Sequence, residues 1–237
     1  MCIRDRIPSC SEAEKSKGYI DVITLYFQIF KTMELGVEKI IDKISAVGWR
    51  IVRGGPIDPR PVSSLFRGLF SESESEVEHA CRSFENNFII QGELCSGAFY
   101  IIPFLIAALK SNIGIGRKFV YELLYQIANG FSDLKNEVRF ERVFDEFHFF
   151  VPSLNVAGVP LEIACHNAVS EGFPIYISDL RGSEEMLTMS LELLYFFPQF
   201  YDITKPEINE IIKSGEVSGR SLELLREALI TLRRSKV

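Results

Sequence analysis

Residues that usually mark catalytic or metal-binding sites are scarce in this sequence. It has three histidines and one tryptophan, and its five cysteines are an odd number with no Cys-x-x-Cys pair among them. These counts exclude a disulfide framework and a zinc knuckle, which need closely spaced cysteine pairs. Free cysteines are typical of a reducing compartment, so we expect a cytoplasmic protein.

Positive charge is also scarce. Lys and Arg number 26 against 32 Asp and Glu, and the formal net charge is -6. Because a nucleic-acid groove needs clustered cations, we expect no nucleic-acid partner. The apolar stretch 19–30 is too short to span a bilayer and contains Asp21, so we also expect no membrane segment.

The first residues, MCIRDR, resemble the translation of a sequencing adapter. We therefore treat residues 1–31 as an N-terminal extension that need not be native, and we assign no function to it. Hydrophobic residues make up 47% of the chain, enough to bury a substantial core. We expect residues 32–237 to form a single domain.

A short phrase occurs three times along this domain. It is a proline, followed six residues later by Leu or Ile, then a basic residue, then Ser or Gly. The copies begin at Pro103, Pro174 and Pro206, about 71 and about 32 residues apart. Repetition at a period near 32 residues is typical of stacked helix pairs.

Helical periodicity covers most of the domain. The expected helices are 33–48, 62–70, 76–89, 94–110, 117–129, 161–171, 174–181, 184–197, 206–214 and 219–234. Helices 117–129 and 184–197 have the apolar pattern of inner helices, and 94–110 reads as an outer one that Pro103 should kink or restart. Pro206 suits a first helical turn. The predicted fold is all-α, a right-handed α-solenoid of stacked antiparallel helix pairs.

Residues 131–160 interrupt the period with an irregular, aromatic-rich insertion. Insertions of this length in compact domains are often functional, and aromatic anchors with polar neighbours are typical of interface hot spots. The predicted partner-binding residues are Phe140, Phe144, Asp145, Glu146, Phe147 and His148. The alternative is that these rings pack back against the helices as cover, because exposed aromatic patches are rare on monomers.

The stretch from Trp49 to about Phe200 resembles bacterial proteins of the HEAT-repeat, armadillo-like family. The matching phrases are Gln91-Gly92 before a helix, Ile102-Pro103-Phe104-Leu105-Ile106, Leu123-Leu124 through Gly130, and Ala168-Val169 followed by Gly172 and Pro174. The resemblance implies a scaffold or partner-binding protein, and some similar proteins are immunity proteins encoded beside toxins. The insertion 131–160 and the lack of an arginine in helix 184–197 depart from the family pattern.

Two sets of residues contain side chains suited to a metal site or to catalysis, but their spacing does not match a known motif. Glu162 and His166 lie four apart on a helix and could form a metal or acid/base site with His148 and Asp145, but the two histidines that a zinc helix usually carries are missing. Cys165 could act as a thiol nucleophile with the same His148 and Asp145, but its apolar neighbours favour packing. We therefore expect no bound metal and no cofactor.

Two further motifs also have ordinary explanations. The turn Gly114-Ile115-Gly116-Arg117 has no preceding strand and no third glycine, so it is expected to connect two helices rather than bind phosphate. The acidic run Glu72, Glu74, Glu76 and Glu78 suits the N-terminal end of a helix. The alternative for this run is contact with a basic partner.

These observations favour a non-catalytic protein that binds another protein, possessing no enzyme activity of its own. The resemblance makes an immunity-like or regulatory role the most specific expectation. The alternative is an enzyme related to the HEAT-like DNA glycosylases. That alternative is disfavoured by the acidic charge balance, because such an enzyme needs a basic groove.

Overall fold

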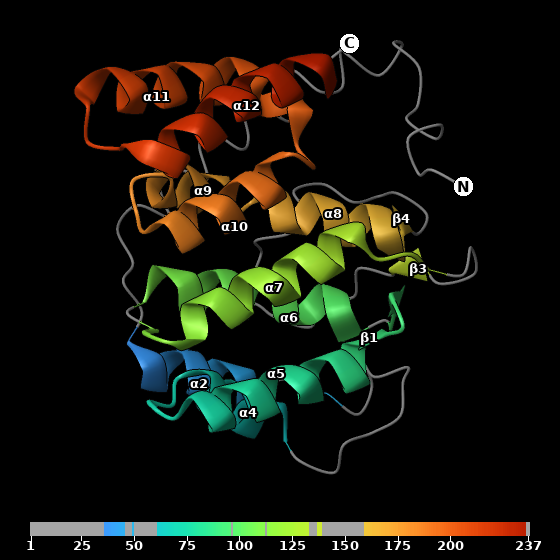
Figure 1. Ribbon diagram of the computed structural model, residues 1–237. Helices are drawn as coiled ribbons and strands as arrows, with labels where there is room; N and C mark the ends of the chain where they lie inside the picture. Colours follow the sequence, from blue (N-terminus) through green and yellow to red (C-terminus); the bar gives the residue numbers. More distant parts are fainter. Residues whose placement is uncertain are drawn as a thin grey trace. The chain divides into compact units, whose positions relative to one another are not determined.

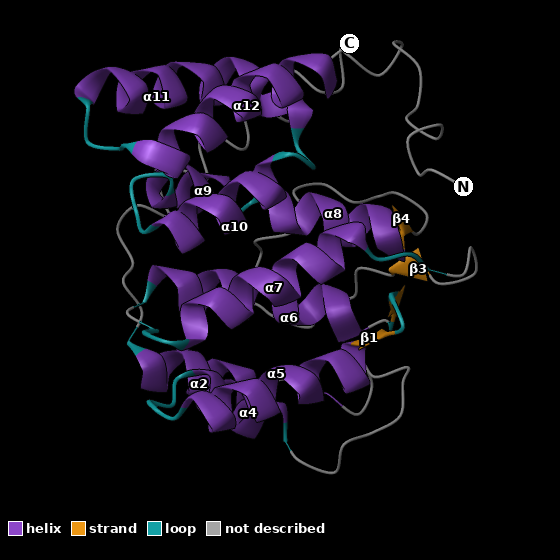
Figure 2. Cartoon of the chain, in the orientation of Figure 1, coloured by secondary structure: helices purple, strands orange, loops and turns teal. Residues whose placement is uncertain are grey.

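The computed structural model describes residues 36–45, 49, 61–95, 97–111, 113–132, 137–138 and 159–235, all of which belong to the compact unit Leu35–Val237. Helices dominate this part of the chain (Figure 2), so the prediction of an all-α protein is confirmed. The helices are α2 (Val37–Ser45), α4 (Val62–Leu69), α5 (Glu74–Phe88), α6 (Gly97–Lys110), α7 (Gly116–Asn129), α8 (Leu161–Ser170), α9 (Phe173–Asp179), α10 (Glu184–Leu194), the 3-10 helix η3 (Pro198–Phe200), α11 (Tyr201–Ser214) and α12 (Gly219–Ser235).

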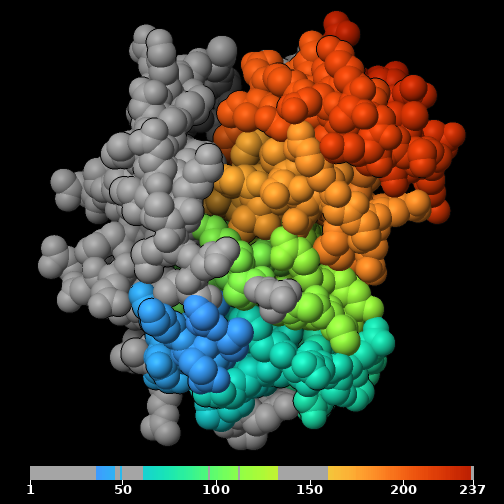
Figure 3. Space-filling model, turned by 90° about the vertical axis from the view of Figure 1, so that its left-hand side faces the viewer, coloured from blue at the N-terminus to red at the C-terminus, as the bar shows by residue number. Residues whose placement is uncertain are grey.

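Within this unit, helices that are two or three elements apart in the sequence pack against one another. α5 contacts α7, α7 contacts α10 and α10 contacts α12, while α2 contacts α6 and α6 contacts α8. Helices that follow each other in the sequence also pair, as α4 does with α5 and α11 with α12. Figure 1 shows the resulting layers in sequence order, and Figure 3 shows the same order from blue to red on the surface.

Helix α6 is the most deeply covered element, which contradicts its predicted outer position. It packs against α2, α5, α7 and α8. Its sequence, GAFYIIPFLIAALK, has Lys110 as its sole charged residue, and Ile101, Ile102 and Leu105 are fully shielded from solvent. The helix also continues through Pro103 instead of restarting there. The outer position was predicted from one apolar stripe along this helix. The helix is in fact apolar around most of its circumference, as expected for a helix with neighbours on several sides.

The repeated phrase finishes at or just after the end of a helix in all three copies, and the copy at Pro174 also begins in the first turn of α9. Its last residues close α6 at Lys110 and α11 at Ser214, and Arg181 lies two residues after the end of α9. A basic side chain at this place suits the negative end of the helix dipole. Pro206 lies inside α11, which begins at Tyr201, so its predicted first-turn position is wrong.

Two short β-ribbons lie between layers, and the sequence analysis predicted neither. β1 (Ile89–Ile90) pairs antiparallel with β2 (Glu93–Leu94) between α5 and α6, and β3 (Glu137–Val138) pairs antiparallel with β4 (Val159–Pro160) between α7 and α8. The first ribbon turns at Gln91 and Gly92, whose φ values of 54° and 85° are left-handed. The second ribbon brings together the two ends of the segment 139–158, within the predicted insertion.

Gly116 provides a test of the packing between layers. A Cβ at this position would lie 1.9 Å from the Leu69 carbonyl oxygen, whereas a Cβ at Gly36 would meet nothing within 4 Å. We expect Gly116→Ala to lower the free energy of unfolding by about 1–3 kcal/mol, because backbone must move to admit the methyl group. Denaturant unfolding would measure this loss. The matched change Gly36→Ala should cost less than about 0.5 kcal/mol, and equal effects of the two changes would contradict the described packing.

Candidate protein-binding face

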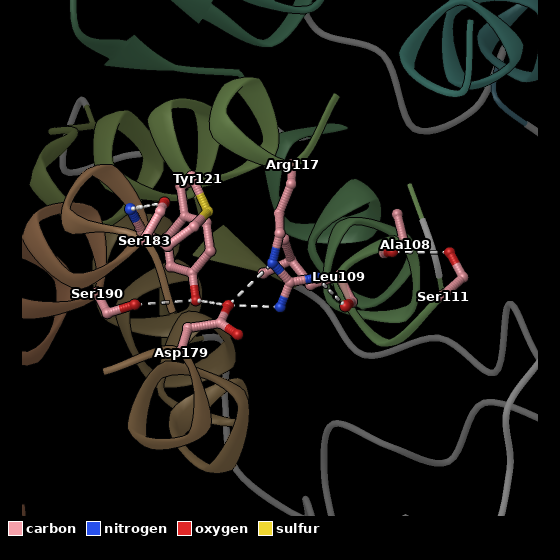
Figure 4. A network of polar contacts seen from close by, with 9 residues as sticks. Ala108, Leu109, Ser111, Arg117, Tyr121, Asp179, Ser183 and Ser190 are labelled. Atoms are coloured by element: carbon pink, nitrogen blue, oxygen red, sulfur yellow. Dashed lines mark hydrogen bonds and ion pairs between the residues drawn. The ribbon is translucent and has the colours of Figure 1, made fainter. Parts of the chain in front are cut away.

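A polar cluster joins α7 to three neighbouring elements (Figure 4). One oxygen of Asp179, Oδ2, accepts hydrogen bonds from Tyr121 Oη at 2.6 Å and from Arg117 Nε at 3.0 Å, and it also accepts from Arg117 Nη2. Arg117 Nη1 donates to the Leu109 carbonyl at 2.6 Å, and Ser190 Oγ donates to Tyr121 Oη at 3.2 Å. The cluster therefore links α7 with the end of α6, with α9 and with α10.

Burial makes this cluster a strong structural constraint. The side chains of Arg117 and Asp179 are 24% and 16% exposed, and Tyr121 and Ser190 are buried. Burial is the main cause that raises the pKa of Tyr121, and the negative charge of Asp179 raises it further. The phenol therefore stays protonated and donates its hydrogen bond to Asp179. The cluster is not predictable from local sequence patterns, because Asp179 and Ser190 lie about 60 to 70 residues from Arg117 and Tyr121.

The exposed surface of α7 and α10 forms a second feature, which we call the α7–α10 face. It consists of Glu122 and Tyr125 on α7, Glu185, Met189 and Glu192 on α10, and Phe196 just after α10. Tyr125 is 37% exposed, and its ring meets the Phe196 ring edge-on with centroids 5.4 Å apart. Glu122, Glu185 and Glu192 are exposed, while Met189 and Phe196 are half-buried.

Carboxylates dominate the electrostatics of this face. Partial desolvation by the neighbouring helices, with repulsion from Glu85, Glu185 and Glu78, raises the pKa of Glu122, and Lys118 offsets only part of this. Lys118 itself is already paired with Glu74 of α5 at 2.7 Å. The face therefore combines an aromatic centre with an excess of negative charge.

The predicted partner-binding residues Phe140, Phe144, Asp145, Glu146, Phe147 and His148 lie outside the described residues. Sequence reasoning did not select Tyr125 or Met189, because an aromatic or a methionine within an apolar helix pattern indicates core. The signal available was the polar pair Glu122 and Gln126, which identifies the outward side of α7. Gln126 Nε2 donates to Glu85 Oε1 at 2.6 Å, which ties this side to α5.

The remaining candidate residues have structural partners. Glu162 accepts a hydrogen bond from the Ser132 backbone N–H at 3.3 Å, and His166 Nε2 lies 3.2 Å from the Phe196 carbonyl oxygen. Cys165 is completely buried, which raises its thiol pKa. Across the part of the chain that the structure describes, no group of three or more His, Cys, Asp or Glu side chains is placed to hold a metal ion.

The glycine turn connects helices, as predicted. Gly114 has a φ of 58°, and Gly116 begins α7 in close contact with Leu69 of α4. The acidic run lies at the start of α5, where Glu74 binds Lys118 and Glu76 accepts from Ser71. Ser73 is the N-cap residue of α5, but its side chain makes no capping hydrogen bond.

A half-buried Lys110 lies near Glu171, at the C-terminal ends of α6 and α8. Burial lowers the pKa of Lys110 to about 8 and raises the pKa of Glu171 to about 7, although each charge favours the other. We therefore expect the stability of the folded chain to change with pH near neutrality.

No protein-family model matches this chain, and neither a curated protein nor a solved structure matches it. The resemblance to HEAT-repeat proteins therefore stays a prediction. In the described ranges, no helix is both long enough and apolar enough to cross a bilayer.

The first test at this site concerns the polar cluster. Arg117→Ala removes three hydrogen bonds and leaves Asp179 partly buried without its cation, so we expect it to lower the free energy of unfolding by more than about 2 kcal/mol. The control is Arg220→Ala, because Arg220 is 75% exposed and its bridge to Glu184 is 3.6 Å long. The control should lose less than about 1 kcal/mol in denaturant unfolding. A loss at Arg117 no larger than the control would contradict the proposed structural role.

The second test uses pH. The pKa of Glu171 is higher in the folded chain than its ordinary value, so the folded state binds this proton more tightly. Its contribution to stability is therefore present below about pH 4.5 and lost as the pH rises through about 7. We expect Glu171→Gln to become more stable relative to the unmodified chain over this window, by up to about 3 kcal/mol. Chemical unfolding at several pH values would measure the difference. A constant difference, like that expected for the exposed Glu210→Gln, would contradict the prediction.

Proposed function

We propose that this chain is a non-catalytic α-solenoid that binds another protein through the α7–α10 face. The observation that carries the proposal is the exposed Tyr125, which packs edge-on against Phe196 on a face that also carries three exposed carboxylates. Tyrosine anchors surrounded by polar side chains are enriched among interface residues that dominate binding energy. Contacts between helices that are two or three elements apart in the sequence support the solenoid part of the proposal.

An immunity-like or regulatory role in the bacterial cytoplasm is the most specific form of this proposal. It draws on the resemblance to HEAT-repeat proteins and on the free cysteines, of which Cys81 and Cys165 are buried. In this role the chain would block a partner by covering part of its surface. Binding through rigid helices suits such a role, because little ordering entropy is lost on association.

The alternative, a DNA glycosylase-type enzyme, has less support. A phosphate-binding groove needs unpaired cations on one surface. On α5 and α7, Arg82 lies 3.5 Å from Glu78 and Lys118 lies 2.7 Å from Glu74. The surface that these two helices share with α10 would repel phosphate.

The insertion 131–160 is the second surface that we propose for partner binding. Phe144 and Phe147 are the residues of this insertion that we would replace, because the sequence predicts them as aromatic anchors of the interface. The segment 139–158 starts and ends at the β3–β4 ribbon, between α7 and α8. Variants on the two surfaces can therefore be compared in one binding assay.

The proposal is tested by isolating the cellular partner with a tagged chain and measuring its affinity by calorimetry. We expect Tyr125→Ala to weaken the complex by more than about 2 kcal/mol. The same change should lower the free energy of unfolding by no more than about 1.5 kcal/mol, because the ring is partly exposed and loses one aromatic contact, with Phe196. The matched control Ile230→Ala alters a 53% exposed side chain on α12 and should change neither quantity. The double variant Phe144→Ala with Phe147→Ala tests the insertion. Full affinity in both the Tyr125 and the double variant would contradict the proposal, as would tight, salt-dependent binding of duplex DNA.

A further inference from the structure

We infer that the α7–α10 face accepts a basic amphipathic helix presented by a partner protein. This inference rests on the proposed function and adds the chemistry of the partner. It combines two independent properties of the face, namely an apolar track and a surrounding excess of carboxylates.

The apolar track runs along α10 and continues onto α7. Met189 and Phe196 lie seven residues apart and therefore share one side of the helix. Glu185 and Glu192, each four residues before one of them, lie beside this apolar pair. Tyr125 meets Phe196 from α7. Met189 and Phe196 are about 10 Å apart along the axis, which is close to two turns of a partner helix. Methionine adapts its shape to different apolar partners, and aromatic rings provide large contact area.

The charges around this track select the sign of the partner. Glu122, Glu185 and Glu192 border it, and Glu78 and Glu85 of α5 lie close enough to act on Glu122. The cations that act near them are already engaged, Lys118 with Glu74 and Arg82 with Glu78. A partner that brings Lys or Arg would relieve the repulsion among these carboxylates, whereas an acidic partner would increase it.

A helix fits these two properties better than an extended segment. An amphipathic helix carries one apolar stripe with charged residues on either side of it, which is the complement of a linear apolar track bordered by carboxylates. The partner stripe would contact Tyr125, Met189 and Phe196, and its flanking cations would reach the glutamates. Such recognition needs no rearrangement of α7 or α10.

The test uses synthetic peptides as probes. The first is an amphipathic Leu/Lys helix about 18 residues long. The second replaces every Lys by Glu, and the third has the same composition as the first in an order that destroys the apolar stripe. Calorimetric titration at about 0.05 and about 0.2 M salt measures the affinity of each. We expect the Leu/Lys helix to bind at least about 10-fold more tightly than either of the others.

Two charge-matched variants separate this face from general attraction to a negative protein. The face variant is Glu122→Gln, Glu185→Gln and Glu192→Gln together, and the control variant is Glu93→Gln, Glu210→Gln and Glu216→Gln. All six positions are exposed, and each triple change removes the same charge. The face variant should weaken the Leu/Lys helix at least about 10-fold and the control less than about 3-fold, and Tyr125→Ala should weaken it about 10-fold.

Equal weakening by the two triple variants would overturn the inference, as would binding of the Glu peptide or failure of the Leu/Lys helix to bind. Unfolding curves confirm that each variant is folded before its affinity is interpreted. These outcomes are distinct from a failure of the proposed function. If the natural complex needs Tyr125 and the Leu/Lys helix does not bind, the inference alone falls. If the natural complex is indifferent to the face and the insertion, the proposed function falls.

Discussion

One carboxylate oxygen, Oδ2 of Asp179, holds together helices that are distant in the sequence. It accepts hydrogen bonds from Arg117 and Tyr121 of α7, and through these residues it connects to the end of α6 and to Ser190 of α10. Inside a packed layer such a cluster stabilises one arrangement strongly, because each partner left alone would be a buried, unsatisfied polar group. The hydrogen bond from Ser190 to Tyr121 favours one register between α7 and α10.

That register positions the α7–α10 face. Tyr121 and Tyr125 lie one helical turn apart on α7, so fixing the first toward Ser190 brings the second toward Phe196. Ser183 adds to this arrangement by capping α10, where its Oγ accepts from the Met186 backbone N–H at 3.3 Å. The buried cluster and the exposed face are thus neighbours along the same pair of helices, and this pair carries the residues that we propose for binding.

Local sequence patterns predicted much of this fold. The periodicity of apolar residues located the helices, and the break in the repeat located the connection between α7 and α8. Residues that act through long-range contacts were not predictable in this way. Asp179 reads as the polar end of a short helix until Arg117 and Tyr121 are seen beside it. The hairpin at Gln91 and Gly92 was also not predictable from local sequence. It is held by backbone hydrogen bonds to Phe131, which lies about 40 residues further along the chain. The burial of α6 depends on how many helices surround it, and the sequence of a single helix does not reveal that number.

Hydrogen exchange measured with and without the Leu/Lys helix tests the account most directly. The account predicts that the peptide slows exchange in α7 and α10, with little change in α11 and α12. Protection concentrated in α11 and α12, or no protection at saturating peptide, would contradict the assignment of the α7–α10 face as the binding surface.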